Sequence, residues 1–358
     1  MVQTTSLWCG IDVAKNNFEA AFVIDETESN LSSIPVSRFA NDADGIRDFL
    51  DALKRYAHEQ GTSLKTCRIV MEATGRYSLT LYSAIVEQTP CLAPAIINPL
   101  KTSNFLKSLG LRNKTDAMDA RALGIYGRDR QPAPYQPLDR NYQDLREMFR
   151  LRKALVDQRT ANQLRLKEMP SGKATQLLGK VIKGIEGGIK KCETEMKVIL
   201  NRNHRMGRDV KLLMTIPGVG FLTAVAVLAE LGDLRRFKRS RQVTAYAGLA
   251  PRIVESGTSV RGRSCLSRVG NTAIRRALYM AALASRRTER SCLAKSYARL
   301  VGVGKSGKSA LCALMRKLLV LMRAILVSEQ PYQFPEEAPH PVENRRKFHG
   351  KLRLEPRF

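Results

Sequence analysis

Four acidic side chains stand where the sequence predicts strands to end or a helix to begin. Asp12 follows the apolar run LWCGI, and Glu72 follows RIVM. Asp116 and Asp119 lie three residues apart in RNKTDAMDA, a spacing that places both on one face of a helix. Carboxylates gathered at one sheet edge repel each other unless divalent cations neutralise them. We therefore expect a site for Mg²⁺ or Mn²⁺ that clamps the attacking and leaving oxygens of a phosphodiester.

Each carboxylate also has an ordinary structural interpretation. Asp12 could close a turn, Glu72 could accept a nearby N–H bond, and Asp116 could be a charge favoured by the helix dipole. Only the joint pattern, together with a basic second half of the chain, favours the metal site.

A stretch after residue 250 offers hydroxyls and cations but no general base. Its serines are Ser256, Ser259, Ser264 and Ser267, and its arginines are Arg252, Arg261, Arg263 and Arg268. A serine needs a base or a cation to become a nucleophile, and the four histidines of the chain are too few and poorly placed for a Ser-His-Asp arrangement. The arginines could stabilise a pentavalent phosphorus. By themselves these residues are most simply a basic DNA-binding loop.

The segment GVGKSGKS, 302–309, matches the phosphate-loop pattern of nucleotide-binding proteins. A phosphate loop follows a buried strand, whereas SCLAKSYARLV before it has apolar residues at helical spacing. We predict a turn between two helices, with Ser309 capping the second helix and Lys305 and Lys308 contacting a nucleic-acid backbone. No nucleotide-binding residues and no ATP are expected. IPGVG, 216–220, similarly resembles a helix-hairpin-helix turn, which could contact phosphate or only connect helices.

The elements that must position these residues follow from hydrophobic periodicity. Strands are predicted at 7–13, 18–24, 37–40, 67–71 and 92–97, with helices starting at Asn41 or Asp42, after Gly75 and at Thr115, and a linker at 127–138. This alternation indicates an α/β domain with a mixed sheet. Helical patterns at 139–168 and 174–200 predict an antiparallel hairpin or coiled coil, and 210–328 is mostly helical. The predicted domains are 1–135 (catalytic), 136–205 (hairpin), 206–329 (serine-containing) and 330–358 (a disordered, proline-rich basic tail).

The formal net charge of +27 indicates the partner. Acidic and basic residues cancel over 1–135, so the whole excess lies after residue 135, which favours a nucleic acid. No run of 18 apolar residues and no signal-peptide pattern occurs, and the seven cysteines are scattered. We expect a cytoplasmic, nucleoid-associated protein with no membrane contact.

Eight motifs carry a resemblance over roughly residues 5–330: GIDVAK, MEATGRY, INP, LRNKTDAMDA, IPGVG, AYAGLAPR, ESGTSVRG and RRALYMAA. Together they resemble the insertion sequence one-ten family of bacterial and archaeal DEDD transposases, which is related to the Piv/MooV invertases. The resemblance implies a RuvC-like (RNase H fold) N-terminal domain whose four metal-binding carboxylates match Asp12, Glu72, Asp116 and Asp119. It identifies Ser256, in ESG, as the catalytic serine. It also implies a bridge RNA as guide, and dimers that pair into a tetramer, with carboxylates and serine from different protomers.

The sequence therefore predicts an RNA-guided DNA recombinase of a mobile element, acting through a covalent phosphoserine. Nucleic acid is expected on 136–358 and on Arg112 and Lys114, near the metal site. Two alternatives stay open: a two-metal nuclease or junction resolvase that uses water, and a non-catalytic nucleic-acid-binding protein.

Overall fold

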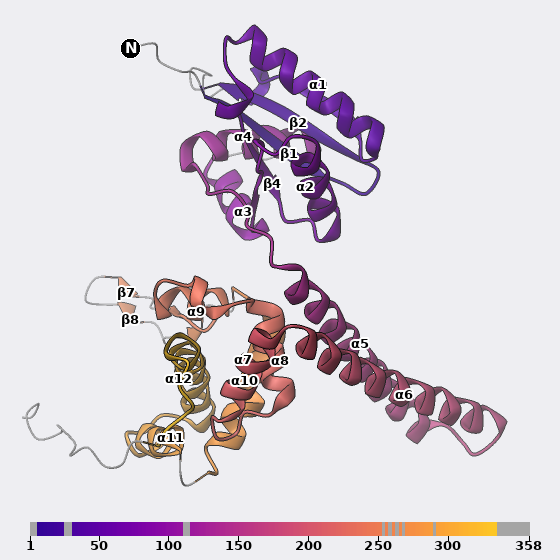
Figure 1. Ribbon diagram of the computed structural model, residues 1–358, viewed down its shortest axis with the longest axis vertical. Coiled ribbons are helices and arrows are strands. Elements are labelled where there is room, and N and C mark those ends of the chain that lie inside the picture. Colours follow the sequence, from indigo (N-terminus) through magenta and orange to yellow (C-terminus); the bar gives the residue numbers. More distant parts are fainter. Residues whose placement is uncertain are drawn as a thin grey trace, which may run out of the picture. The chain divides into compact units, whose positions relative to one another are not determined.

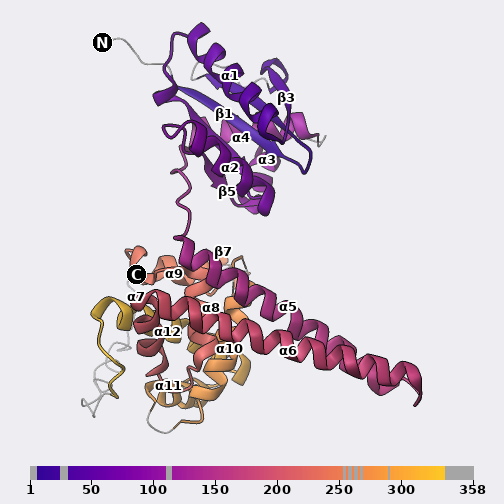
Figure 2. The same ribbon diagram turned by 45° about the vertical axis from the view of Figure 1, so that its right-hand side comes forward.

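The chain forms two compact units, 1–137 and 138–358 (Figures 1 and 2). The computed structural model describes residues 6–24, 31–109, 115–252, 255–256, 260–261, 265–266, 269–288 and 291–334. Within these ranges no helix is both long enough and apolar enough to cross a membrane. The predicted tail is described only as far as residue 334, and the rest of it lies outside these ranges.

The first unit is a five-stranded mixed sheet covered by helices on both faces (Figure 1). Its strands are β1 (Leu7–Val13), β2 (Asn17–Ile24), β3 (Val36–Ala40), β4 (Arg68–Glu72) and β5 (Ala95–Ile97), and its helices are α1 (Ala43–Glu59), α2 (Arg76–Gln88), α3 (Pro99–Ser108) and α4 (Asp116–Arg130). The strand order is β3-β2-β1-β4-β5; β1, β2 and β3 pair antiparallel, while β4 runs parallel to both β1 and β5. The predicted α/β domain with a mixed sheet is confirmed.

Alternation along β1 creates the two faces of this sheet. Leu7, Cys9 and Ile11 are fully buried in a core shared with α1 and α2. Trp8 and its neighbours on the opposite face pack in a second core, which α4 covers. Successive side chains of a strand point to opposite faces, so a polar residue at position 12 must lie on the α4 side.

Glycines let the backbone of α4 lie directly on the sheet. A Cβ added to Gly10 would come within 2.1 Å of the Gly124 nitrogen and 2.2 Å of the Ala120 oxygen. A Cβ added to Gly127 would come within 2.8 Å of Trp8 and of Val70. Trp8, early in β1, therefore lies against Gly127, late in α4, whereas Gly10, later in β1, lies against Ala120 and Gly124, earlier in α4. The helix therefore runs opposite to β1, and its N-terminus lies at the edge where β1 ends.

The sequence placed the end of this helix too early. We predicted a linker from residue 127, but α4 continues through Gly127 to Arg130, and its C-cap, Gln131, has φ 42°. Gly127 is a close-packing position against the sheet rather than a helix terminator.

The second unit consists mostly of helices, as predicted. They are α5 (Arg140–Glu168), α6 (Lys173–Arg202), α7 (His204–Met214), α8 (Phe221–Leu231), α9 (Ser240–Tyr246), α10 (Thr272–Ser285), α11 (Cys292–Gly302) and α12 (Gly307–Ser328). Helices α5 and α6 pack along each other as an arm that projects from this unit (Figures 1 and 2). Only the base of the arm, including Tyr142, Leu145 and Met196, joins the main core. The coiled-coil geometry of the arm and a separate domain at 136–205 stay predictions.

The phosphate-loop-like segment is a connection between two helices, as predicted. Helix α11 precedes it and α12 follows, and Gly304 makes the turn with φ 84°. The predicted cap was wrong: Ser306 is the N-cap of α12, where its hydroxyl oxygen accepts a 3.4 Å hydrogen bond from the Ser309 backbone N–H, and its hydroxyl donates a 2.9 Å hydrogen bond to the Ser309 Oγ. IPGVG likewise joins α7 to α8, and Gly218 (φ 87°) packs against Ser285, where no Cβ would fit.

Candidate active site

Asp12 and Glu72 occupy neighbouring places at the ends of parallel strands. Ile11 of β1 pairs with Met71 of β4, and both are buried in the core under α1 and α2. Asp12 and Glu72 come one residue later in each strand, so both side chains point to the opposite face, the one that α4 covers. Each is half-buried. The prediction that these two residues stand at strand ends is confirmed.

A threonine that the sequence did not single out holds Glu72 in place. The Thr102 hydroxyl donates a 2.5 Å hydrogen bond to Glu72 Oε2 and also approaches the Pro99 carbonyl oxygen at 2.9 Å. Thr102 is only 3% exposed, so its hydroxyl depends on these partners. It lies on α3, which begins at Pro99 with Asn98 as N-cap. Asn followed by Pro is a sequence signal for a helix start, and it could have revealed this element.

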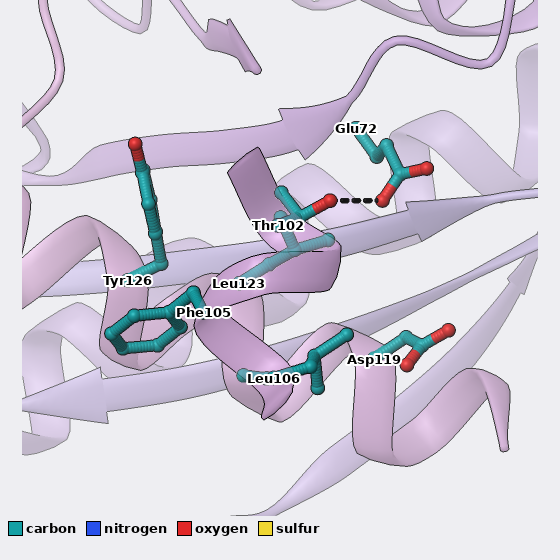
Figure 3. A pocket seen from close by; sticks show the side chains of 8 residues that line it. Glu72, Thr102, Phe105, Leu106, Asp119, Leu123 and Tyr126 are labelled. Atoms are coloured by element: carbon teal, nitrogen blue, oxygen red, sulfur yellow. Dashed lines mark hydrogen bonds between the residues drawn. The ribbon is translucent and has the colours of Figure 1, made fainter. Parts of the chain in front are cut away.

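The N-terminus of α4 brings a third carboxylate to the same place. Asp119 lies in its first turn and lines a small pocket together with Glu72 and Thr102. Figure 3 shows the two carboxylates towards one side of this pocket, with Phe105 and Tyr126 at the other. Two aspartates in the first turn of a helix are favoured by the helix dipole.

Asp116 belongs to the same helix end but not to the pocket. It is the first residue of α4, where Thr115 is the N-cap, and it is exposed. Residues 110–114, with the predicted nucleic-acid contacts Arg112 and Lys114, lie outside the described residues.

The donor set of this pocket fits a hard divalent cation. Glu72 and Asp119 offer carboxylate oxygens and Thr102 a hydroxyl, and Mg²⁺ prefers oxygen ligands, with one or two carboxylates completed by water or substrate phosphate. Among the described residues no three Asp, Glu, His or Cys side chains already lie close enough to hold an ion together.

The serine-containing stretch forms short ribbons between α9 and α10. Arg252 lies in β6 (Pro251–Arg252), which pairs with β9 (Cys265–Leu266). Ser256 lies in β7 (Glu255–Ser256), opposite Val260 of β8 (Val260–Arg261), which also contains Arg261. The side chains of Arg252, Ser256 and Arg261, and the whole of Arg263 and Arg268, lie outside the description.

An ion pair with a buried carboxylate ties the end of this stretch to the base of the arm. Glu230 of α8 is 2% exposed and accepts two 2.8 Å hydrogen bonds from Arg150 of α5 and one of 2.6 Å from Asn271. Asn271 is the N-cap of α10, directly after the serine-containing stretch. Burial alone would raise the pKa of Glu230, but the hydrogen bonds and charge of Arg150 outweigh it, so the pKa is lowered. The network fixes the point where the chain leaves the ribbons and enters α10.

Comparison with known proteins covers both units. Residues 9–169 match a DEDD transposase profile of the IS110 type, and residues 210–298 match the profile described as transposase IS116/IS110/IS902 family. The chain is 30% identical over 329 residues to the pilin gene-inverting protein of Moraxella bovis, covering 91% of this chain and 97% of that protein. It is 28% identical over 286 residues to the transposase for insertion sequence element IS1111A of Coxiella burnetii, covering 65% and 75%.

The DEDD transposase match, 9–169, contains all the residues that line the carboxylate pocket, and the second match, 210–298, lies within the second unit. The resemblance read from the sequence motifs is thereby confirmed: this chain belongs to the IS110 family of transposases.

Proposed function

We propose that this chain is an RNA-guided recombinase that cuts, exchanges and rejoins DNA strands through a covalent link to Ser256. The observation that carries the proposal is the shared pocket of Glu72 and Asp119, at the sheet edge where Asp12 stands next to the last residue of β1. The pilin gene-inverting and transposase names of the relatives support DNA strand exchange rather than simple degradation.

The carboxylates have the role of holding Mg²⁺ or Mn²⁺, with Asp116 joining Asp12, Glu72 and Asp119 when DNA and cation are bound. The cation would supply charge neutralisation at the phosphodiester and lower the pKa of an oxygen nucleophile. Thr102 keeps the Glu72 carboxylate turned towards the pocket. The α4 N-terminus supplies the two aspartates from one rigid helix turn. The mixed sheet with these carboxylates at its strand ends supports a RuvC-like (RNase H) fold for unit 1.

Ser256 then serves as the nucleophile. Its Oγ forms a bond to phosphorus, the bond from phosphorus to the leaving deoxyribose oxygen breaks, and that oxygen takes up a proton. The serine hydroxyl loses its own proton in the same step. Reversal with a different DNA hydroxyl rejoins the strand, so the ester retains the bond energy and no nucleotide hydrolysis is required. Arg252, Arg261, Arg263 and Arg268, from the same stretch, would stabilise the charge at phosphorus.

The partners follow from charge and from the division of the site. The basic excess after residue 135 suits DNA ends, target DNA and a guide RNA together. The carboxylates belong to unit 1 and Ser256 to unit 2. As in the resemblance, we propose that they meet across protomers, in dimers that assemble into a tetramer.

A covalent trap tests the nucleophile. The protein is incubated with Mg²⁺, its RNA and a nicked DNA substrate that prevents religation, and protein–DNA adducts are separated under denaturing conditions. We expect an adduct that Ser256→Ala abolishes and that the matched controls Ser259→Ala and Ser264→Ala retain. A water-dependent nuclease predicts full cutting by Ser256→Ala without any adduct. A non-catalytic binding protein predicts that Asp12→Ala changes no DNA processing at all.

RNA guidance requires a separate test. Purified protein is treated with ribonuclease, and recombination is measured before and after the element-encoded RNA is restored. We expect the activity to disappear and return, whereas recombination that survives the loss of all RNA would exclude guidance.

A further inference from the structure

A groove in the second unit has no role in the chemistry described so far. It has a volume of about 720 Å³ and lies between α10, the start of α12 and the β6–β9 ribbon. Its described lining includes Arg275, Arg276, Tyr279, Lys305, Lys308 and Leu266. The groove therefore brings the two lysines of the 302–309 turn beside two arginines of α10 that are about thirty residues away in sequence.

The polar part of this lining is strongly cationic. Four Lys or Arg side chains line the groove, and none of its described lining residues is acidic. Lys305 and Lys308 are exposed, and neither has a carboxylate partner among the described residues. Arg276 is 3.3 Å from Asp157, whereas Arg275 Nη1 donates a 3.4 Å hydrogen bond to the Ala247 carbonyl oxygen. The positive charge that remains on Lys305, Lys308 and Arg275 attracts a polyanion.

The remainder of the lining is apolar and includes one available aromatic ring. Pro251, Leu266 and Met315 contribute apolar surface, and Tyr279 is 37% exposed on the same side of α10 as Arg275 and Arg276. An exposed aromatic ring beside cations is the arrangement that binds bases of single-stranded nucleic acid, by stacking and by phosphate contacts. A paired base inside a duplex presents no free face to such a ring.

We propose that this groove holds an unpaired nucleotide of the nucleic acid that the protein processes, with its base against Tyr279 and its flanking phosphates on Lys305, Lys308 and Arg275. The volume lies within the range of roughly 300–1,000 Å³ that is usual for small-ligand sites, which leaves room for an unstacked nucleotide. The proposal rests on the proposed function only in the choice of nucleic acid as ligand.

The groove also has a meaningful place in the fold. Pro251 and Leu266 belong to β6 and β9, the ribbon that leads into and out of the segment with Ser256. A nucleotide held here is therefore bound at the base of the serine-containing stretch. Strand exchange requires unpaired nucleotides between two pairing partners, and the groove would hold one of them while pairing changes.

Photo-crosslinking tests the base contact without any requirement for catalysis. The full-length protein is bound to oligonucleotides with one 5-iodouracil, as single strands or annealed to a complement, in deoxyribose and ribose forms. After irradiation, peptides are mapped by mass spectrometry. We expect a crosslink to Tyr279 from unpaired probes, with the ribose and deoxyribose forms showing whether RNA or DNA is preferred. Equal crosslinking from duplex probes, or crosslinks that avoid α10 altogether, would overturn the proposal.

Binding measurements with variants supply the second test. Tyr279→Ala should weaken single-strand binding by roughly 5- to 150-fold, the range for loss of one stacked base, and should leave duplex binding unchanged. Tyr279→Phe should retain the affinity. Met280→Ala is the matched control, because Met280 is 58% exposed on the same helix but lines a different groove. Lys305→Ala and Lys308→Ala should each reduce the salt dependence of binding by about one counterion.

The outcomes separate this proposal from its rivals and from the proposed function. If the groove instead binds an acidic protein segment, Tyr279→Ala should not change the affinity for any nucleic acid. If Tyr279→Phe loses as much affinity as Tyr279→Ala, base stacking on the ring is excluded. Because these assays need no strand cleavage, they can succeed where the serine mechanism fails. Conversely, normal binding of the base at Tyr279 would not show that Ser256 is the nucleophile, which only the covalent trap tests.

Discussion

Replacement of Gly10 by Ala should disable the carboxylate pocket without touching a carboxylate. The added Cβ would lie 2.1 Å from the Gly124 nitrogen and 2.2 Å from the Ala120 oxygen, both backbone atoms that no rotamer change can move. Restoring an ordinary contact of 3.4 Å requires α4 to move away by the difference, about 1.3 Å. Asp119 directly precedes Ala120 and would move with it, away from Glu72.

Two magnitudes follow from that displacement. Overpacking of this kind costs about 1–3 kcal/mol, less than the roughly 5–15 kcal/mol that usually separates a folded domain from its unfolded state. The unit should therefore stay folded, with a lower melting temperature. Misplacement of a reacting group by about 1 Å can cost on the order of 100-fold in rate. We expect a loss of that size in the rate of DNA cleavage.

The assay pairs single-turnover cleavage with thermal denaturation of the same preparation. Gly124→Ala is the matched control on the facing element. A Cβ there meets a side-chain atom of Val23 at 2.7 Å, and the nearest backbone atom, the Gly10 nitrogen, only at 3.4 Å. Gly10→Ala should therefore be much the more damaging of the two. A Gly10→Ala protein with the wild-type cleavage rate would refute the packing of α4 described above.

Three further predictions concern single contacts and the cation. Thr102→Val removes the hydrogen bond to Glu72, worth about 1.5–3 kcal/mol for a charged acceptor, so cleavage should fall roughly 10- to 150-fold, while Thr102→Ser retains it. The pKa of Glu230 is lowered in the folded chain, so its contribution to the free energy of unfolding is fully present above the ordinary carboxyl pKa and is lost as pH falls through the folded pKa. Denaturant titrations at several pH values should show that Glu230→Gln makes the free energy of unfolding less dependent on acid pH. An unchanged pH dependence in Glu230→Gln would contradict the Arg150 pairing. Chelation of divalent cations should stop cleavage while nucleic-acid binding persists, and Asp119→Asn should raise the Mg²⁺ concentration needed for half-maximal rate; cation-independent cleavage would exclude the metal site.

Sequence reasoning located the strand-end carboxylates because their signal is local. A strand predicted at 7–13 places Asp12 near its end, and an apolar run before Glu72 does the same for the next strand. The motif around Asp116 and Asp119 began a helix as predicted. These carboxylates come together because α4 runs opposite to β1 and packs on it at Gly10. That arrangement depends on packing between segments distant in sequence, about which hydrophobic periodicity gives no information.

The misses have related physical causes. Gly127 was predicted to begin a proline-containing linker, yet α4 continues through it, and its missing Cβ makes room for Trp8 and Val70. Thr102 escaped notice because its importance comes from a partner thirty residues away. Ser309 was expected to cap α12 but lies one turn too late, because KSGKS (305–309) offers both Ser306 and Ser309 as caps and only the backbone geometry decides between them. The side chain of Ser256 lies outside the description, so its role stays a prediction.

The projecting arm has a consequence for how such proteins can diverge. Buried side chains of α5 end at Phe149, and the stretch from there to Glu168 spans roughly 28 Å at 1.5 Å per residue. The two family profiles stop at residue 169 and resume at 210, so all of α6 lies between them. Matched gains or losses of whole heptads in both helices would change the reach of the arm by about 10 Å per step and leave both buried cores untouched. Lineages can therefore alter how far the arm reaches while the elements that carry the carboxylates stay where they are.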